Sequence, residues 1–460
     1  MAKRAYETFG VKDTSLSNEK DKLLDSKGDA LSGSLKTAQG LTIWTAVMFV
    51  VGDIAGTGIL ALPKAIVDCG GPLGIVMLFS MCTVAAYTGV TLGWSWEMLE
   101  DRYEEYRLLH VQDPFAAIGY RAMGNFGRYL VRVANYMSIF GCGVIFLLLS
   151  AEMVEGLLSV PLPNITFCVW MLVVAAILVP ISWLGTPKDM WPVAIGATMS
   201  SGIACILIFA NLVILIPETV PNIKHSPIKV EGVFMAFGTI TFAFCGHTVF
   251  PTIQHDMLDR SKFANVIILG YVGMMTMFAP MVISAFYILG DLTSDNVLVT
   301  IEAIDKSWIT YTVQVLFLFH LLSAFNIVLN PLWQGLEHIC HFKNEFGIKR
   351  IILRTLMIGV VLFVAESVPR FGPIMSLVGG TCLNLMVFIL PPIFYELLCR
   401  GDGEFPKVNI PLHMHVIHIE IIVVGIIAGA ASCYSAINEI VAPGTFIPPC
   451  YLNATAAKEL

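Results

Sequence analysis

Two ionisable residues, Asp53 and His247, lie deep inside long apolar segments of this 460-residue chain. A carboxylate in apolar surroundings must take up a proton or find a partner. An imidazole ordinarily titrates near neutral pH. Side chains of these two types in such segments could therefore bind and release protons.

Asp53 stands beside residues that interrupt helices. The stretch GDIAGTGILALPKAI, Gly52 to Ile66, contains Gly56, Gly58 and Pro63. Each interior glycine costs a helix about 1 kcal/mol relative to alanine, and proline removes a backbone donor. The break should expose N–H groups at the start of a second half-helix near Ile59. Those groups and the helix dipole attract an anion such as a carboxylate.

His247 lies in a comparable stretch, FGTITFAFCGHTVFPTIQHDM, which runs from Phe237 to Met257. Gly238, Gly246 and Pro251 weaken a helix there. Interrupted apolar segments at corresponding positions of two halves indicate a transporter binding site. The simpler alternative is that glycine and proline are frequent in membrane helices anyway.

The composition predicts the elements that hold these residues. The chain is 56% hydrophobic and 13% charged, whereas soluble domains are about 25% charged. Its apolar segments are long enough for helices to cross a bilayer, and the short alternating segments of a membrane β-barrel are not seen. We therefore expect an all-α polytopic membrane protein with eleven transmembrane helices. The predicted spans are residues 41–68, 72–99, 128–158, 165–184, 190–216, 232–256, 263–290, 309–338, 351–367, 371–399 and 414–441.

The distribution of basic residues predicts an orientation. With the N-terminus inside, 21 of the 27 lysines and arginines fall on the inner side, as the positive-inside rule requires. Two N-x-[ST] sequons, at Asn164 and Asn453, then fall outside and predict glycosylation. Cys69 and Cys450 also fall outside, and a disulfide between them is one option.

Both interrupted segments carry a family resemblance. GTGILALPKAI, Gly56 to Ile66, resembles the first-helix signature of the amino acid/auxin permease family. FAFCGHTVFPTIQHDM, Phe242 to Met257, is similar to its sixth helix. The resemblance covers about residues 40–445 and implies a LeuT-like, five-plus-five inverted-repeat fold with an extra C-terminal helix. It also implies transport of amino acids or related compounds, coupled to protons or sodium.

The chain divides into a transporter domain and two tails. The first 38 residues are polar and have no apolar core, which predicts a disordered cytosolic tail over 1–38. The transporter domain covers 39–445, and the predicted orientation makes 446–460 an extracytosolic tail. Within the domain, the resemblance implies repeat one over about 41–216, repeat two over about 232–399 and the extra helix over about 414–441.

The resemblance implies a substrate site made of three groups. Backbone N–H groups bind the substrate carboxylate, carbonyls accept from its amino group, and side chains of the third and eighth helices complete the pocket. These groups are, respectively, Gly56, Thr57 and Gly58; Phe244, Cys245 and Gly246; and Asn135, Tyr136, Ser323 and Asn326. Sodium-coupled relatives tend to carry an asparagine four residues before the first glycine. Gly52 stands there, which favours protons over sodium.

We interpret Asp53 and His247 as proton-coupling residues, because an ionisable residue within a membrane segment usually marks a functional site. For Asp53, helix capping or an ion pair with Lys64 is the alternative. For His247, the alternative is a ring that donates to a free carbonyl at the break.

The N-terminal tail contains EKDKLL, an acidic dileucine pattern made by Glu19, Leu23 and Leu24. An adaptor protein could bind this pattern, which favours an endosomal, lysosomal or vesicular membrane over the plasma membrane.

The sequence predicts a secondary active transporter of amino acids or related zwitterions. The alternative is a non-transporting sensor or scaffold that signals through its tail. The sequence shows no nucleophile–base set, Walker motif or dinucleotide fingerprint, so it does not predict an enzyme. We expect no cofactor, metal or nucleic-acid partner. The expected partners are the substrate, the lipid bilayer and an adaptor.

Overall fold

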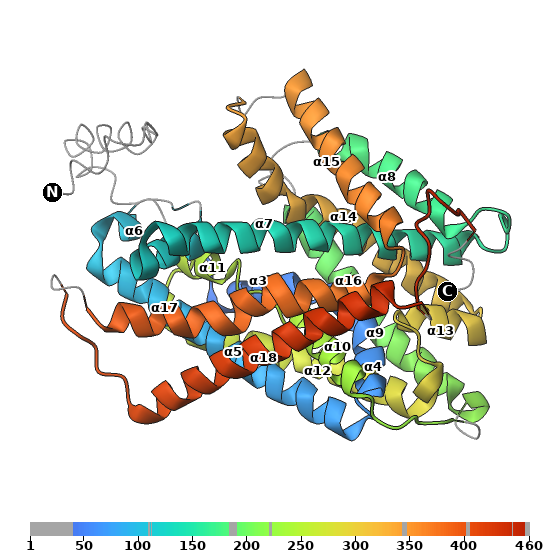
Figure 1. Cartoon of the computed structure of the whole chain (residues 1–460), viewed down its shortest axis with the longest axis horizontal. Coiled ribbons are helices and arrows are strands. Elements are labelled where there is room, and N and C mark those ends of the chain that lie inside the picture. Colours follow the sequence, from blue (N-terminus) through green and yellow to red (C-terminus); the bar gives the residue numbers. More distant parts are fainter. Residues whose placement is uncertain are drawn as a thin grey trace. The chain divides into compact units, whose positions relative to one another are not determined.

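The chain was analysed as a computed structural model that describes residues 40–108, 111, 113–183, 191–219, 223–342, 347–401, 405–443 and 445–455. The sorting motif of Glu19, Leu23 and Leu24 and the predicted tail 1–38 lie outside these residues. The chain from Thr42 onward forms one unit, and its regular elements, in the described part, are helices (Figure 1). In chain order they are α3 (Ile43–Ile54), α4 (Gly58–Asp68), α5 (Pro72–Arg102), α6 (Glu104–Leu108), α7 (Pro114–Leu158), α8 (Phe167–Trp183), α9 (Trp191–Thr219), α10 (Val230–Ala243), α11 (Phe250–His255), η4 (Arg260–Lys262), α12 (Phe263–Leu289), η5 (Gly290–Leu292), α13 (Val297–Ile304), α14 (Trp308–Ile339), α15 (Ile348–Ser367), α16 (Phe371–Val378), η6 (Gly379–Leu383), η7 (Leu385–Ile389), α17 (Leu390–Cys399) and α18 (Leu412–Val441).

Most of these helices have the length and composition of membrane spans. Among the described residues, seven helical segments are long and apolar enough to cross a bilayer, and the bent pair α3–α4 makes an eighth candidate. Apolar helices α8 and α10 are shorter, with 17 and 14 residues. Helix α15 carries Lys349, Arg350 and Arg354 in its first two turns. The chain is therefore a polytopic helical membrane protein. The total of eleven transmembrane spans remains a prediction from the sequence.

Helix α7 begins well before the predicted span 128–158. Asp113 caps its N-terminus by accepting a hydrogen bond from the Ala116 N–H at 3.3 Å, and Pro114 occupies the first turn. Gly124, with a φ of 64°, then kinks the 45-residue segment, in a backbone region that glycine adopts without strain. The apolar pattern found only the part beyond this kink, because the first turns are polar on one side.

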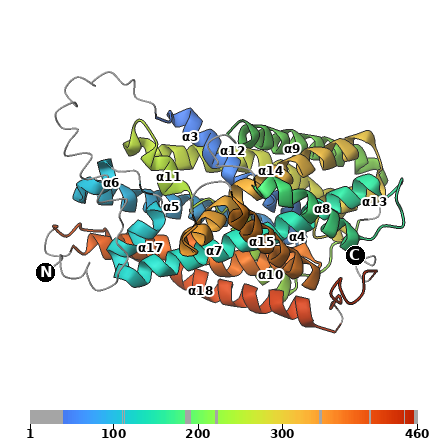
Figure 2. The same cartoon turned by 90° about the horizontal axis from the view of Figure 1, so that it is seen from above.

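The predicted span 371–399 is not one regular helix. Helices α16 and α17 enclose two π-helical segments, η6 and η7, which flank Asn384. The Asn384 side-chain amide donates to the Gly425 carbonyl of α18 at 2.8 Å. Local π geometry therefore turns a buried amide toward α18, which lies along one side of the described helices in Figure 2.

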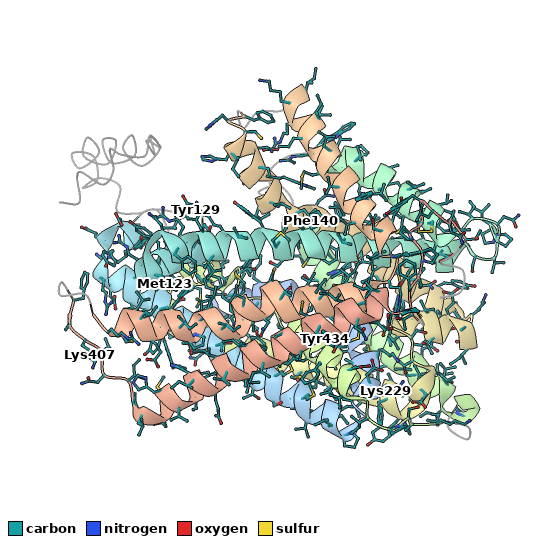
Figure 3. All side chains as sticks on the ribbon, viewed as in Figure 1. Met123, Tyr129, Phe140, Lys229, Lys407 and Tyr434 are labelled. Carbon is teal, nitrogen blue, oxygen red and sulfur yellow. A yellow bond between two sulfur atoms is a disulfide. The ribbon has the colours of Figure 1, made fainter. Side chains whose placement is uncertain are left out.

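Helix α18 is peripheral, whereas α7 is enclosed. Only 22% of the most apolar window of α18 is buried, compared with 72% for α7. Figure 3 shows the outward side chains of α18 around Tyr434, with Lys407 and Lys229 toward opposite ends of the helices. Exposed Val424, Ile427 and Tyr434 form an apolar face that suits contact with lipid.

The interior is organised by two sets of helix contacts. Helix α14 packs between α7 and α9, and α10 packs against α4, α16 and α18. Figures 1 and 2 both place α4 beside α10. The interrupted segments are therefore brought together by packing.

Candidate functional site

The first interruption is present where the glycines predicted it. Helix α3 ends at Ile54, α4 begins at Gly58, and their axes differ by 62°. Thr57 at the N-cap of α4 is 1% exposed and makes no capping hydrogen bond with its side chain within the described part. The first N–H groups of a helix have no partner inside it. The break therefore presents backbone donors at the positive end of α4.

The second interruption is also confirmed. Helix α10 ends at Ala243 and α11 begins at Phe250. The Tyr271 hydroxyl, from α12, donates to the Phe244 carbonyl at 2.8 Å. The Gly246 carbonyl accepts from the Val249 N–H at 3.2 Å. Two of the three carbonyls predicted to accept from a substrate amino group thus already have protein partners. Cys245 is half-buried, and Gly246 is buried.

Two glycines hold the interruptions against each other. A Cβ atom added to Gly58 would lie 2.6 Å from Ala243 Cα, at the end of α10. A Cβ atom on Gly246 would lie 2.8 Å from Ile54 Cγ1, at the end of α3. Side chains larger than hydrogen do not fit at either contact. The end of α10 therefore meets the start of α4, and the end of α3 meets the second break.

Asp53 occupies the interior face of α3. The neighbouring faces are filled, since Gly52 packs on Thr198 of α9 and Val50 packs on Gly270 of α12. Asp53 itself is exposed and lies within electrostatic range of Cys142 of α7 and Cys245 of the second break. An exposed carboxylate near α7 and the second break can contact a ligand or water.

The two alternative roles of Asp53 are not the ones observed. Lys64 forms an ion pair with Asp68, one turn along α4, with Nζ 3.0 Å from Oδ1. The Asp53–Lys64 pair was therefore the wrong alternative. Helix α4 has Thr57 as its N-cap and receives no side-chain cap from the described residues, so Asp53 does not cap it.

His247 is fixed by a helix that the sequence did not link to it. Its ring is fully buried, with Nε2 3.0 Å from the Thr88 Oγ1 of α5. The same hydroxyl lies 3.1 Å from both the Val84 and the Ala85 carbonyls of α5. The ring also lies 4.9 Å from that of Phe250. The partner of this nitrogen is thus a hydroxyl on α5, where a free carbonyl at the break was the alternative.

Side chains predicted from α7 and α14 do not share one depth. A Cβ atom on Gly143 would contact Leu329, and the Tyr136 hydroxyl approaches Gly335. The two helices are thus antiparallel, and Tyr136 faces the end of α14 near Gly335. Asn326 lies nine residues before Gly335, or roughly 13 Å along the helix.

Asn326 is the more informative member of that predicted group. It is 5% exposed, and neither of its side-chain amide atoms has a partner among the described residues. Ser323, one turn earlier, is also buried. Buried amides are nearly always hydrogen-bonded, so Asn326 is available to a ligand or water. The side-chain oxygen of Asn135, Oδ1, is similarly unpartnered within the described part.

Sequence reasoning missed His320 of α14. Its ring is 3% exposed and Nδ1 lies 3.0 Å from the Ala197 carbonyl of α9. Nε2 has no partner among the described residues and lies 3.9 Å from where a Cβ atom on Gly56 would stand. The missed signal was a histidine in the middle of the predicted span 309–338, where an ionisable residue is rare and usually functional.

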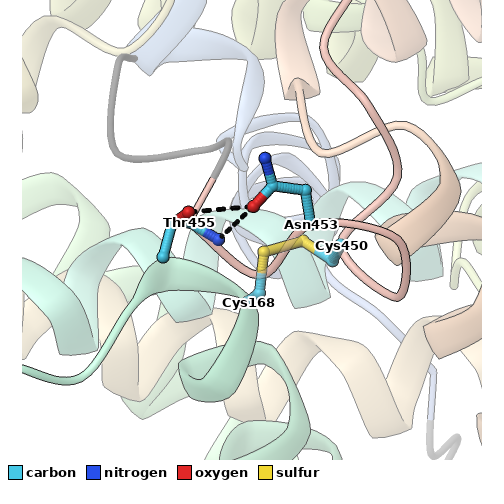
Figure 4. The surroundings of a disulfide bond; sticks show 4 residues. All are labelled: Cys168, Cys450, Asn453 and Thr455. Atoms are coloured by element: carbon cyan, nitrogen blue, oxygen red, sulfur yellow. Dashed lines mark hydrogen bonds between the residues drawn. A yellow bond between two sulfur atoms is a disulfide. The ribbon is translucent and has the colours of Figure 1, made fainter.

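The option of a Cys69–Cys450 disulfide, which the sequence left open, is not the one observed. Cys450 pairs with Cys168 at the start of α8 (Figure 4), and Cys69 is a free, buried thiol. The sequence assigned Cys168 to an apolar span, and bonding partners 282 residues apart depend on tertiary packing. Both sequons lie close to this bond in sequence, four residues before Cys168 and three after Cys450.

Both sequon asparagines are exposed. Asn453 Oδ1 accepts from the Thr455 N–H at 3.1 Å and from its hydroxyl at 2.8 Å (Figure 4). The disulfide and the two exposed sequons therefore belong to the same end of the molecule.

The fold and the two apposed interruptions define a helical membrane protein with an interior polar site. The profile of the family described as "Transmembrane amino acid transporter protein" matches residues 39–437. The chain therefore belongs to the transmembrane amino acid transporter family, which is a transporter family and not an enzyme family.

Similar proteins from Arabidopsis thaliana cover most of the chain. Amino acid transporter AVT1C is 23% identical over 91% of this chain and 73% of its own length. Amino acid transporter AVT3B is 24% identical over 94% of this chain and 99% of its own length. Amino acid transporter ANT1 is 24% identical, with 84% and 90% covered. The similarity thus extends over both interrupted segments.

Proposed function

We propose that this chain is a secondary active transporter of amino acids or related small zwitterions, driven by protons. The substrate binds where the first and sixth spans are interrupted. The observation that carries the proposal is the apposition of the two breaks, with the uncapped start of α4 beside Asp53. Membership of an amino acid transporter family supplies the substrate class.

A zwitterion matches the charges of the first break. The Gly56 N–H already donates to the Ile54 carbonyl at 2.7 Å. The backbone N–H groups of Thr57 and Gly58 are therefore the donors for a carboxylate, and the dipole of α4 favours negative charge there. The Cys245 carbonyl remains for the amino group, because the Gly246 carbonyl already accepts from the Val249 N–H at 3.2 Å. Asn326 and Ser323 of α14 supply further polar contacts, whereas Tyr136 serves the inner end of the α7–α14 interface.

Proton coupling is proposed for Asp53, with His247 as a second group. Asp53 is exposed within the bundle, so protons and water can reach it. Protonation removes a charge whose presence is costly in low-dielectric surroundings and would bias the carrier between its inward and outward states. A sodium-binding asparagine at position 52 is disfavoured, because a Cβ atom there would lie 2.7 Å from Thr198 Oγ1.

The proposed architecture has eleven spans, as two inverted repeats of five and an extra helix, α18. Repeat one covers about residues 41–216 and repeat two about 232–399, within a transporter domain of 39–445. The α3–α4 and α10–α11 pairs support this arrangement, since each begins one repeat and each is interrupted. An odd number of spans per repeat inverts the second repeat.

The proposed orientation has a cytosolic N-terminal tail and an outer C-terminal tail, 446–460. The Cys168–Cys450 disulfide supports it, because disulfides form in oxidising compartments and both cysteines lie at the end assigned to the outside. We also propose glycans on Asn164 and Asn453. The membrane is endosomal, lysosomal, vesicular or plasma membrane, with the tail residues Glu19, Leu23 and Leu24 read by an adaptor.

A reconstitution experiment tests this function. The purified full chain is placed in liposomes, and uptake of each common radiolabelled amino acid is measured with and without an imposed proton gradient. We expect concentrative uptake of a subset of amino acids that collapses when an ionophore dissipates the gradient.

Two outcomes would contradict the proposal. Uptake that depends on a sodium gradient and not on pH would mean that sodium, and not the proton, is the coupling ion. Saturable binding without flux in either direction would favour the sensor or scaffold.

A further inference from the structure

His320 has one ring nitrogen fixed by the protein and one left open. Nδ1 lies 3.0 Å from the Ala197 carbonyl oxygen, which can only accept a hydrogen bond. Nδ1 must therefore carry the proton. In a neutral imidazole the other nitrogen is then an acceptor, so Ala197 of α9 selects the tautomer that presents a lone pair at Nε2.

The nitrogen that carries this lone pair lies beside the first break. Gly56 has no side chain. Among the described residues, and apart from its own chain neighbours, Nε2 is the only atom within 4 Å of where its Cβ would stand. The ring is 3% exposed, and no described residue donates to Nε2. A buried acceptor without a donor is destabilising. The site therefore favours a bound group that carries a hydrogen-bond donor.

The neighbouring groups divide the break into two chemical halves. Asp53, one turn before Gly56, and His320 Nε2 offer negative charge and an acceptor. The uncapped start of α4 at Gly58 offers donors and the positive end of a helix dipole. A molecule with an ammonium and a carboxylate on adjacent atoms fits both halves at once.

We propose that His320 Nε2 is a substrate-contacting residue that accepts a hydrogen bond from the α-amino group. This inference rests on the proposed transport function and adds a specificity element to it. His320 makes the break selective for molecules that carry an amine. A carboxylic acid without the amine would fill the α4 half only.

The test uses two variants that separate the two nitrogens. The amide nitrogen of His320→Asn can take the place of Nδ1 and keep the bond to Ala197, but nothing replaces Nε2. The longer His320→Gln side chain can place an amide oxygen near the Nε2 position. Both variants are studied as full chains in liposomes, with thermal stability in detergent measured first.

Two substrate analogues separate the two halves of the break. One is the amino alcohol that lacks the carboxylate of the transported amino acid, and the other is the carboxylic acid that lacks its amine. Both are tested as competitors of uptake. We expect His320→Asn to weaken the binding of the amino acid and of the amino alcohol about tenfold, or about 1.4 kcal/mol. The affinity for the carboxylic acid should change less than twofold. His320→Gln should recover part of the loss.

Two results would overturn the role of His320. An equal loss for both analogues would mean that the ring only packs the break. Unchanged binding of both would mean that Nε2 holds a buried water only. If the unmodified chain moves no amino acid at all, the proposed transport function itself fails. If the unmodified chain transports and the preference for the amine is unchanged in His320→Asn, only the role of His320 fails.

Discussion

The two interruptions look alike in sequence and differ in how the protein fills them. At the second break, the Tyr271 hydroxyl of α12 donates to the Phe244 carbonyl, and Thr88 of α5 is hydrogen-bonded to His247. At the first break, α4 starts without a side-chain cap from the described residues, and His320 Nε2 has no partner among them. One break is braced by its neighbours, and the other presents unused donors and acceptors.

This difference assigns different work to the two breaks. A group that already has a protein partner must lose that bond before it can hold a ligand, which reduces the net gain from binding. At the first break, the start of α4 and His320 Nε2 need no such exchange among the described residues. We therefore expect substrate and proton chemistry to concentrate at the first break, while the second fixes its geometry through the Gly58–Ala243 and Gly246–Ile54 contacts.

The largest effect should come from Asp53→Asn. An amide cannot take up or release the coupling proton, so we expect loss of gradient-driven uptake by at least about tenfold, a change of roughly 1.4 kcal/mol. Exchange of labelled for unlabelled substrate should persist, because it needs no net proton movement. Uptake and exchange are measured in the same liposomes as a function of external pH.

Asp259→Asn is the matched control for this substitution. Asp259 precedes η4 and pairs at the surface with Lys262, with Oδ2 2.9 Å from Nζ. The control should keep the pH profile of the unmodified chain. If Asp53→Asn also keeps that profile, the proton is carried elsewhere and His247 becomes the first residue to examine.

A smaller effect is expected from Gly58→Ala. Its Cβ would lie 2.6 Å from Ala243 Cα, so the two breaks must separate by a few tenths of an ångström or more. Overpacking of this kind costs about 1–3 kcal/mol. We expect substrate affinity to fall by about five- to tenfold, measured as the concentration for half-maximal uptake.

Gly202→Ala provides the control, because a Cβ at Gly202 of α9 meets no described atom within 4 Å. It should transport as the unmodified chain does. Equal behaviour of the two variants would show that close contact between the breaks is not needed for binding.

The interruptions themselves could be predicted, because their causes are local. A glycine lacks a side chain and a proline lacks an N–H wherever they stand, so Gly56, Gly58 and Pro251 mark their breaks without any tertiary information. Family resemblance then gave the chemistry of the first break. The first turns of α7 were not predicted, because only one side of the helix is apolar there.

The partners across the bundle could not be predicted. His320 matters because Ala197 and Gly56 come to it from two other helices, and Cys450 finds Cys168 from 282 residues away. Tyr136 was expected near Asn326, although helix register moves a side chain about 1.5 Å per residue. Such errors of depth are unavoidable where an apolar run has no internal marker.

The smallest effect should come from Tyr271→Phe, which removes the brace of the second break and nothing else. The Phe244 carbonyl would lose its 2.8 Å hydrogen bond while staying buried, at a cost of about 1–3 kcal/mol of stability. We expect a lower melting temperature and a loss of substrate affinity no greater than about threefold, because the first break is untouched. Tyr287→Phe on the same helix is the control, since Tyr287 is 59% exposed. A loss for Tyr271→Phe as large as that for Asp53→Asn would mean that the second break contributes directly to binding, and the contrast between the two breaks would fail.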